Sequence, residues 1–250
     1  MKQVLIDYTL HLADNSLILG QRNAEWCGHG PVLEQDIAIT NISLDLIGQA
    51  RNFYQYAATL IGNDATEDSL AYLRKERDFK NCLLVEQPKG DWAQTILRQF
   101  FFSQYQYLIF QQMQNSKDEQ LAAIAEKSLK EVTYHLRWSS EWVIRLGDGT
   151  EESHNRMLKA IDELWQYIDE LFSATNYELL AASDGSGVNI PRLKEPWMNK
   201  VKEIFSEATL TITGKTLMQT GGKEGKHTEH LGNILAELQF MQRTYPGCEW

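Results

Sequence analysis

The chain has 250 residues, and 24 Lys and Arg against 34 Asp and Glu give it a formal net charge of −10. Its length is enough for one large core, and its negative field disfavours nucleic acid as a partner. The 3 cysteines, Cys27, Cys82 and Cys248, are too scattered for a disulfide framework or a zinc site, which indicates the reducing cytoplasm.

Apolar residues recur at helical spacing through most of the chain, and only 5 prolines interrupt it. This pattern predicts an all-α protein that forms one domain over residues 1–250. No apolar stretch is long enough for a membrane span, and charged residues such as Asp7 and Asp14 break the N-terminal segment, so no signal peptide is expected. The predicted helices cover residues 4–26, 33–61, 67–77, 92–114, 116–146, 151–172, 195–208 and 228–245.

Three further features belong to this prediction. Ser116 and Glu119 match a capping box, which would open the helix that runs to Leu146. Residues 182–191 are the best candidate for an internal linker, and residues 210–213 are expected to be extended. The expected inner stripe of the helix over 33–61 consists of Leu33, Ile37, Asn41, Leu44, Gly48, Arg51, Tyr54 and Ala58.

The long helices have the layout of a di-iron carboxylate bundle, in which Glu and Glu-x-x-His ligands point inward from four helices. At the two mid-helix places where Glu-x-x-His is expected, this chain has Gly48 with Arg51 and Val132 with His135. Only His135 is a metal-ligating residue type, so these four are interpreted as vestigial metal-site positions. A His135 that is hydrogen-bonded inside the core is favoured over a His135 bound to metal. We therefore predict no catalytic, cofactor-binding or metal-binding residue in this chain.

The Glu-x-x-His spacing occurs twice elsewhere. Glu151 and His154 lie in the first turn of a predicted helix, where acidic residues complement the helix dipole. Glu224 and His227 lie in a loop that contains Gly225. Because neither pair is in the middle of a helix on an apolar stripe, we do not expect either to belong to a buried di-iron site.

Arg51 has two interpretations. If it faces the core, its charge must be paired, because an unpaired buried guanidinium costs several kcal/mol. Asp45, Glu131 or Glu25 could then supply the carboxylate, and the ion pair would fill the space of a metal pair. Alternatively, the helix is rotated slightly and Arg51 extends to the surface.

A glycine-rich segment leads into the last predicted helix. A helix N-terminus beside lysines attracts anions, so a contact with phosphate or CoA, or with another subunit, is conceivable. A structured loop that only sets the start of the helix is the commoner meaning of such a segment. The residues of this possible interface or anion loop are Gly221, Gly222, Lys223, His227 and His230.

Aromatic residues are dense between Phe100 and Tyr107, and Phe100, Phe101 and Phe102 cannot share one helix face because successive residues are about 100° apart. Either part of this aromatic surface is buried against a partner chain, or a thick core buries two faces of the helix. The sequence alone leaves both possibilities open.

A resemblance to a known family rests on four blocks, namely Gln21–His29, Leu44–Phe53, Leu83–Pro88 and Thr220–Gly232. With these blocks, essentially the whole chain resembles the C subunits of bacterial phenylacetyl-CoA epoxidase, the multicomponent 1,2-phenylacetyl-CoA monooxygenase of aerobic phenylacetate degradation. The resemblance implies a ferritin-like, non-catalytic structural subunit that pairs with and stabilises a catalytic A subunit.

The same resemblance implies the other components of such an assembly. The A subunit is expected to carry the di-iron centre and to bind most of the phenylacetyl-CoA, whose ring the complex epoxidises. A small B subunit joins the assembly, and a flavin and iron–sulfur reductase delivers electrons from NADPH. The alternative function is an iron-binding, ferritin-like oxidase with unconventional ligands such as Asp45, Glu131 and His135.

Overall fold

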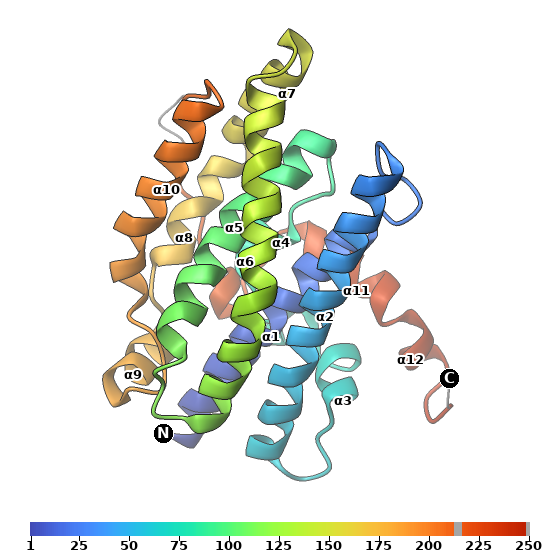
Figure 1. Ribbon diagram of the computed structural model, residues 1–250. Coiled ribbons are helices and arrows are strands. Elements are labelled where there is room, and N and C mark those ends of the chain that lie inside the picture. Colours follow the sequence, from blue (N-terminus) through green and yellow to red (C-terminus); the bar gives the residue numbers. More distant parts are fainter. Residues whose placement is uncertain (213–216, 249–250) are drawn as a thin grey trace. The chain divides into compact units, whose positions relative to one another are not determined.

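The computed structural model describes residues 1–212 and 217–248 (Figure 1). Every regular element in these two ranges is a helix, so the all-α prediction is confirmed. The chain divides into two compact units. Unit 1 comprises Met1–Pro88 and Gly221–Trp250, and unit 2 comprises Lys89–Thr220.

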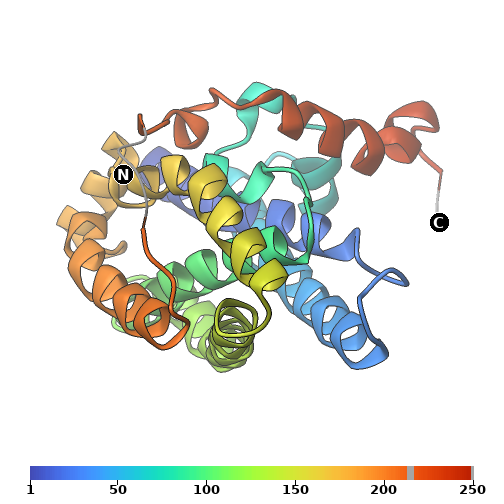
Figure 2. The same ribbon diagram turned by 90° about the horizontal axis from the view of Figure 1, so that it is seen from above.

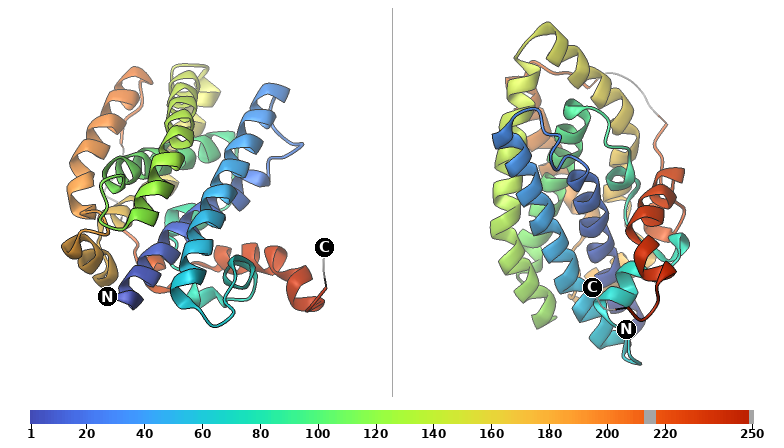
Figure 3. Two further views of the ribbon diagram at one scale, coloured as in Figure 1. Left: turned by 60° about the horizontal axis from the view of Figure 1, so that its bottom comes forward. Right: turned by 90° about the vertical axis from the view of Figure 1, so that its right-hand side faces the viewer.

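Unit 1 is built on two long antiparallel helices, α1 (Lys2–Ala24) and α2 (Leu33–Ile61), which pack side by side (Figure 3). Asp36 fixes the turn between them, because its carboxylate accepts hydrogen bonds from the backbone N–H groups of Gly30 (3.0 Å) and Gly28 (3.1 Å). These two bonds hold the pKa of Asp36 below its ordinary value. The shorter elements of unit 1 are α3 (Glu67–Tyr72), η1 (Glu76–Asp78), α4 (Leu83–Glu86), η4 (Gly222–Glu224), α11 (Glu229–Leu238) and α12 (Phe240–Thr244).

The buried face of α2 differs from the predicted inner stripe. The helix buries Ile39, Ile42, Leu46 and Phe53, together with Tyr54 and Ala58, the last two as expected. Both stripes contain apolar residues at helical spacing and share Tyr54, but the buried one also contains Phe53, so burying it removes more apolar area from water. The predicted inner stripe is therefore wrong for the exposed positions Leu33, Ile37, Asn41, Leu44, Gly48 and Arg51.

Unit 2 is organised around α5 (Trp92–Met113), which packs against α6 (Glu119–Gly147), α7 (Glu151–Leu164) and α10 (Lys194–Glu207) (Figure 2). Phe100, Phe101 and Phe102 are all buried. Phe101 contacts the rings of Trp165, Trp197 and Phe205, and the indole N–H of Trp197 donates to the Phe101 carbonyl oxygen at 2.9 Å. A thick core within the chain therefore accounts for the three phenylalanines. The remaining helices are η2 (Trp165–Tyr167), α8 (Ile168–Phe172), α9 (Asn176–Asp184) and η3 (Ile190–Leu193).

Three local predictions for unit 2 need correction or restriction. The helix α6 is capped by Asp118, whose side chain accepts from the Leu121 N–H at 2.9 Å, and not by Ser116, which donates to the Ser186 carbonyl oxygen at 2.7 Å. That second bond also holds part of the predicted linker 182–191 inside unit 2. Residues 210–212 form no regular element, and Thr213 lies outside the described residues.

Candidate functional site

The two candidate positions on α2 face solvent. Gly48 is exposed, and the side chain of Arg51 is 68% exposed. Arg51 donates its Nε to Oε1 of Glu67 at 3.4 Å, and Gln55 donates to the same oxygen at 2.9 Å. The buried ion pair proposed for Arg51 is therefore wrong, and the surface alternative describes it. Both positions are exposed to solvent, whereas the ligands of a di-iron centre lie in the interior of a helix bundle.

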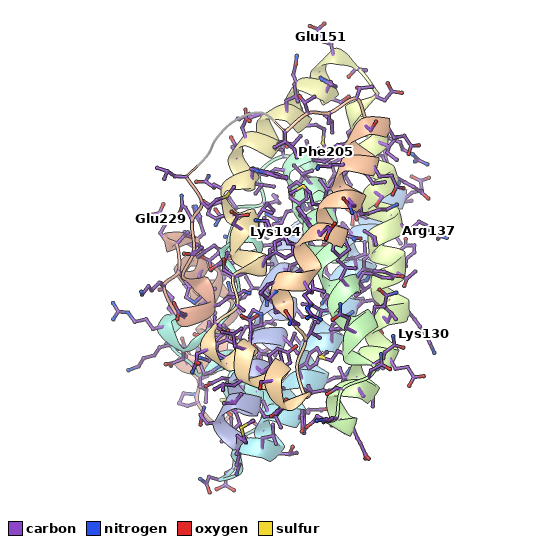
Figure 4. The ribbon with its side chains drawn as sticks, turned by 90° about the vertical axis from the view of Figure 1, so that its left-hand side faces the viewer. Lys130, Arg137, Glu151, Lys194, Phe205 and Glu229 are labelled. Carbon is purple, nitrogen blue, oxygen red and sulfur yellow. The ribbon has the colours of Figure 1, made fainter. Side chains whose placement is uncertain are left out.

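The two candidate positions on α6 are fully buried. Val132 and His135 lie on the inner face of the helix, and Lys130 and Arg137 extend from its outer face (Figure 4). The backbone carbonyl oxygen of His135 accepts a hydrogen bond from the Ser139 hydroxyl at 2.7 Å. Burial on an apolar helix face agrees with the interpretation of His135 as a core residue, and its absence from metal coordination stays a prediction.

The donor set does not fit a di-iron centre. Within residues 1–212 and 217–248, no group of three or more His, Cys, Asp or Glu side chains could hold a metal ion. The two Glu-x-x-His pairs outside the expected positions have other partners. His154 is hydrogen-bonded to the Gly147 carbonyl oxygen at 2.7 Å, and His227 is hydrogen-bonded to the carboxylate of Glu86. A metal centre of this class needs several convergent carboxylates, so no chemistry through iron is derived for this chain.

The most developed polar site is a buried cluster around Glu86 in unit 1, which we call the Glu86 cluster. The fully buried carboxylate of Glu86 accepts at Oε2 from Asn81 Nδ2 and His227 Nδ1, each at 2.8 Å. At Oε1 it accepts from the backbone N–H of Thr228 at 2.7 Å and from the Thr228 hydroxyl at 2.8 Å. The Glu86 backbone oxygen accepts from Nε and Nη2 of Arg22 at 3.2 and 3.0 Å. This cluster ties α1, α4 and the segment before α11 together.

His227 carries a positive charge in this cluster. Its Nδ1 faces the Glu86 carboxylate, and its Nε2 faces the Phe79 carbonyl oxygen at 2.9 Å, so both ring nitrogens must donate. Burial has the largest single effect and lowers the pKa of His227, but the hydrogen bond and charge of Glu86, the hydrogen bond to Phe79 and the charge of Asp14 together raise the pKa above 6.5. The pair is therefore a buried ion pair with hydrogen bonds on both sides of the ring.

The glycines of the predicted anion loop are explained by close backbone contacts. A Cβ on Gly222 would lie 2.5 Å from the carbonyl oxygen of Asn81, and one on Gly225 would lie 2.4 Å from that of Arg77. Gly225 also has a φ of +79°, which side chains rarely adopt. The structured-loop alternative accounts for this geometry, and anion binding stays a prediction.

The other residues named for this loop are also placed by unit 1. Gly221 has a φ of +131°, and its carbonyl oxygen accepts from the Lys226 N–H at 2.9 Å. Lys223 is only 2% exposed, so its charge is not presented on the surface. The backbone oxygen of His230 accepts from Nη2 of Arg22 at 3.3 Å. The structure therefore brings Gly221, Gly222, Lys223, His227 and His230 into one packed segment.

A second buried network in unit 1 was not predicted. Asp14 of α1 accepts hydrogen bonds from the Tyr54 hydroxyl at 2.6 Å, from the backbone N–H of Lys80 at 2.7 Å and from both Nη atoms of Arg74. The Arg74 guanidinium also lies 4.2 Å from the ring centre of Phe79. Burial raises the pKa of Tyr54 well above its usual value, so the hydroxyl keeps its proton and donates. The sequence signal for this network is Asp14, one of the charged residues that interrupt the apolar pattern of α1.

The comparisons with known proteins identify the family of this chain. The model of the family described as phenylacetic acid catabolic protein matches residues 1–250. The C subunit of 1,2-phenylacetyl-CoA epoxidase from Escherichia coli K12 is 49% identical over 246 residues, which cover 98% of this chain and 99% of the relative. A ribosomal protein L11 methyltransferase from Dictyoglomus turgidum is 45% identical, but over only 49 residues, 20% of this chain and 16% of that protein.

The longer match spans both proteins almost completely, so it includes the helices of both units and the Glu86 cluster. The all-α architecture agrees with the ferritin-like fold expected from the resemblance. In the described ranges, no helix has the length and apolar character needed to cross a membrane. The chain belongs to the phenylacetic acid catabolic protein family, and its resemblance to the epoxidase C subunits is confirmed.

Proposed function

We propose that this chain is the non-catalytic structural subunit of a phenylacetyl-CoA epoxidase and that it pairs with and stabilises the catalytic subunit. The observation that carries the proposal is the 49% identity to the E. coli C subunit over 98% of this chain and 99% of that protein. The match leaves no room for an additional domain in either protein. The simplest function for this chain is therefore the one that the C subunit has in its multicomponent enzyme.

The side chains of the described residues support a role without chemistry of its own. The exposed pair Gly48 and Arg51 supplies no ligand, and His135 is not joined by the carboxylates that an iron pair requires. The fully buried carboxylates of Glu86 and Asp14 are occupied by hydrogen bonds within unit 1. The di-iron centre and most of the phenylacetyl-CoA site are accordingly assigned to the catalytic subunit.

The proposal also includes the other components of the enzyme complex. A small B subunit and an NADPH-dependent flavin and iron–sulfur reductase complete the assembly, which acts in the cytoplasm during phenylacetate catabolism. A protein that binds only the folded state of its partner stabilises it by mass action. We therefore expect the catalytic subunit to be poorly soluble or poorly ordered when this chain is absent.

The test is co-expression of the catalytic subunit with and without this chain, followed by measurement of soluble yield, iron content and epoxidation of phenylacetyl-CoA. The expected result is a stable complex with iron in the catalytic subunit and little activity without this chain. Full activity of the catalytic subunit alone would contradict the structural role.

The alternative of an iron-binding oxidase is tested by elemental analysis of the isolated chain after reconstitution with ferrous iron. The structural proposal expects iron far below one atom per chain. Stoichiometric iron that disappears in a His135→Ala variant would favour the alternative, in which Asp45, Glu131 and His135 are ligands. A Glu237→Ala variant, altered at an exposed carboxylate on α11, is the matched control for nonspecific binding.

A further inference from the structure

Six exposed positions of α2 follow the spacing of a coiled-coil seam. Steps of three and four residues alternate along them, which is the repeat that keeps one helix face against another helix. With a rise of about 1.5 Å per residue, they form a stripe roughly 26 Å long. The positions of this α2 stripe are Glu34, Ile37, Asn41, Leu44, Gly48 and Arg51.

The α2 stripe carries two large apolar side chains that unit 1 leaves uncovered. Ile37 is 53% exposed and Leu44 is 62% exposed. Between Leu44 and Arg51, a Cβ built on Gly48 would meet nothing within 4 Å. No contact within unit 1 requires a glycine there, and a glycine in the middle of a helix is unfavourable on its own. The gap above Gly48 can receive a large side chain from another helix.

Two of the three mirrored pairs of the stripe are complementary when it is read in the opposite direction. About the midpoint of residues 42–43, acidic Glu34 mirrors basic Arg51 and bulky Ile37 mirrors Gly48. The central pair, Asn41 with Leu44, sets a polar amide against an apolar side chain and contributes no such match. In an antiparallel pair of identical helices, mirrored positions face each other, so opposite charges would meet at both ends and a large side chain would meet a gap on each side of the centre.

We infer that two copies of this chain pair through the α2 stripe, with the two helices antiparallel. Glu34 of each copy meets Arg51 of the other, and Ile37 of each copy fills the space above Gly48 of the other. Arg51 uses its Nε for Glu67 at 3.4 Å, and a guanidinium has further N–H groups for a second carboxylate. Charge complementarity and the mirrored Ile37 and Gly48 select a second copy over an unrelated helix.

A single helix stripe of this length buries less surface than a standard protein interface, which removes about 800 Å² per partner. We therefore expect a reversible dimer with micromolar affinity. The inference does not depend on the proposed function, because it concerns the isolated chain and needs no catalytic subunit.

The test is sedimentation velocity of the purified full chain over a range of micromolar to submillimolar concentrations. Glu34→Arg places two cations opposite each other at both ends of the dimer, and Arg51→Glu places two anions there. Either variant is expected to weaken dimerisation by at least about tenfold. The double variant Glu34→Arg/Arg51→Glu restores opposite charges and is expected to return the dissociation constant to about the wild-type value.

Glu237→Arg is the matched control, since it makes the same charge change as Glu34→Arg at an exposed site outside the stripe. Circular dichroism of each variant shows whether it is folded. A wild-type chain that stays monomeric at every concentration overturns the inference. This holds even if the stripe variants weaken a complex with a catalytic subunit. A double variant as weak as the single ones overturns the antiparallel pairing as well.

Discussion

Replacing Glu86 by Gln tests whether the Glu86 cluster stabilises unit 1. The substitution keeps the shape of the side chain and removes its charge. The native carboxylate accepts four hydrogen bonds, from Asn81, from His227 and twice from Thr228. A glutamine has one accepting oxygen, and its NH2 group can only donate. If the oxygen stays with Thr228, the NH2 group faces the donors of Asn81 and His227.

The size of the loss follows from these contacts. A hydrogen bond between charged groups contributes about 1.5–3 kcal/mol, and a buried donor left without an acceptor costs about 1–3 kcal/mol. Their sum is about 4 kcal/mol, within the range of about 3–5 kcal/mol for removing one member of a buried ion pair. In a chain of this size, such a change lowers the midpoint of thermal unfolding by roughly 10 °C.

The loss depends on pH because His227 titrates. Its pKa is raised above 6.5 in the folded chain, so the native state binds this proton more tightly than the unfolded state does. This stabilisation is complete below about pH 6.5 and disappears as the pH rises through the raised pKa. The difference between wild type and Glu86→Gln is therefore largest in mildly acidic solution and smaller in mildly alkaline solution.

The measurement is urea unfolding, monitored by circular dichroism, at about pH 6 and at about pH 8.5. An ordinary histidine is largely charged at the first pH and neutral at the second. Glu237→Gln makes the same chemical change on the exposed surface of α11 and is expected to stay within about 0.5 kcal/mol of wild type. If Glu86→Gln is as stable as Glu237→Gln at the lower pH, the hydrogen bonds of the Glu86 cluster do not stabilise the fold.

Three further substitutions test the packing of unit 1 by thermal and urea unfolding at low protein concentration. Gly48→Ala should stabilise the chain by about 0.5–1 kcal/mol, because the site is open and inside a helix; a loss of stability would show a contact that the structure lacks. Gly225→Ala should destabilise it by about 2 kcal/mol or more, since φ is +79° and Arg77 blocks the Cβ, and a neutral result would contradict this backbone geometry. Tyr54→Phe should cost about 1.5–3 kcal/mol by removing the 2.6 Å bond to Asp14, whereas an unchanged midpoint would mean that the bond contributes nothing.

The long helices were predictable because glycine and proline mark their ends. The predicted helix 33–61 has the observed bounds, with Pro31 before it and Gly62 after it. The helix α9 was missed although its signals are local, namely a capping box between Thr175 and Glu178 and a left-handed Gly185. The four-residue α4 is too short for a periodic pattern, so no sequence signal could have found it.

The orientation of α2 could not be read from periodicity. Ile37 and Leu44 repeat at helical spacing as regularly as Ile39 and Leu46, and only the second pair is buried. Periodicity identifies the existence of an apolar face, but a helix with two such faces needs knowledge of its neighbours. The same limit explains why the sequence could not decide between the buried and the surface interpretation of Arg51.

The Glu86 cluster joins residues that are far apart in sequence. Glu86 and His227 are separated by 141 positions, so no local pattern predicts their contact. Three of the four blocks that carry the family resemblance nevertheless meet in this cluster, through Arg22, Glu86 and His227. A resemblance marks such residues without saying what they touch, which is why His227 was assigned to a possible anion loop.

The saturation of the buried carboxylates bears on what unit 1 can do. An ionised carboxylate offers about four lone-pair positions, and Glu86 accepts four hydrogen bonds. Asp14 is similarly engaged by Tyr54, Lys80 and Arg74. A metal ligand or a general base needs a lone pair directed at its target, and these oxygens direct theirs at the protein. Their effect is to hold the segment from Arg74 to Glu86 and the start of α11 in one register, as the proposed structural role requires.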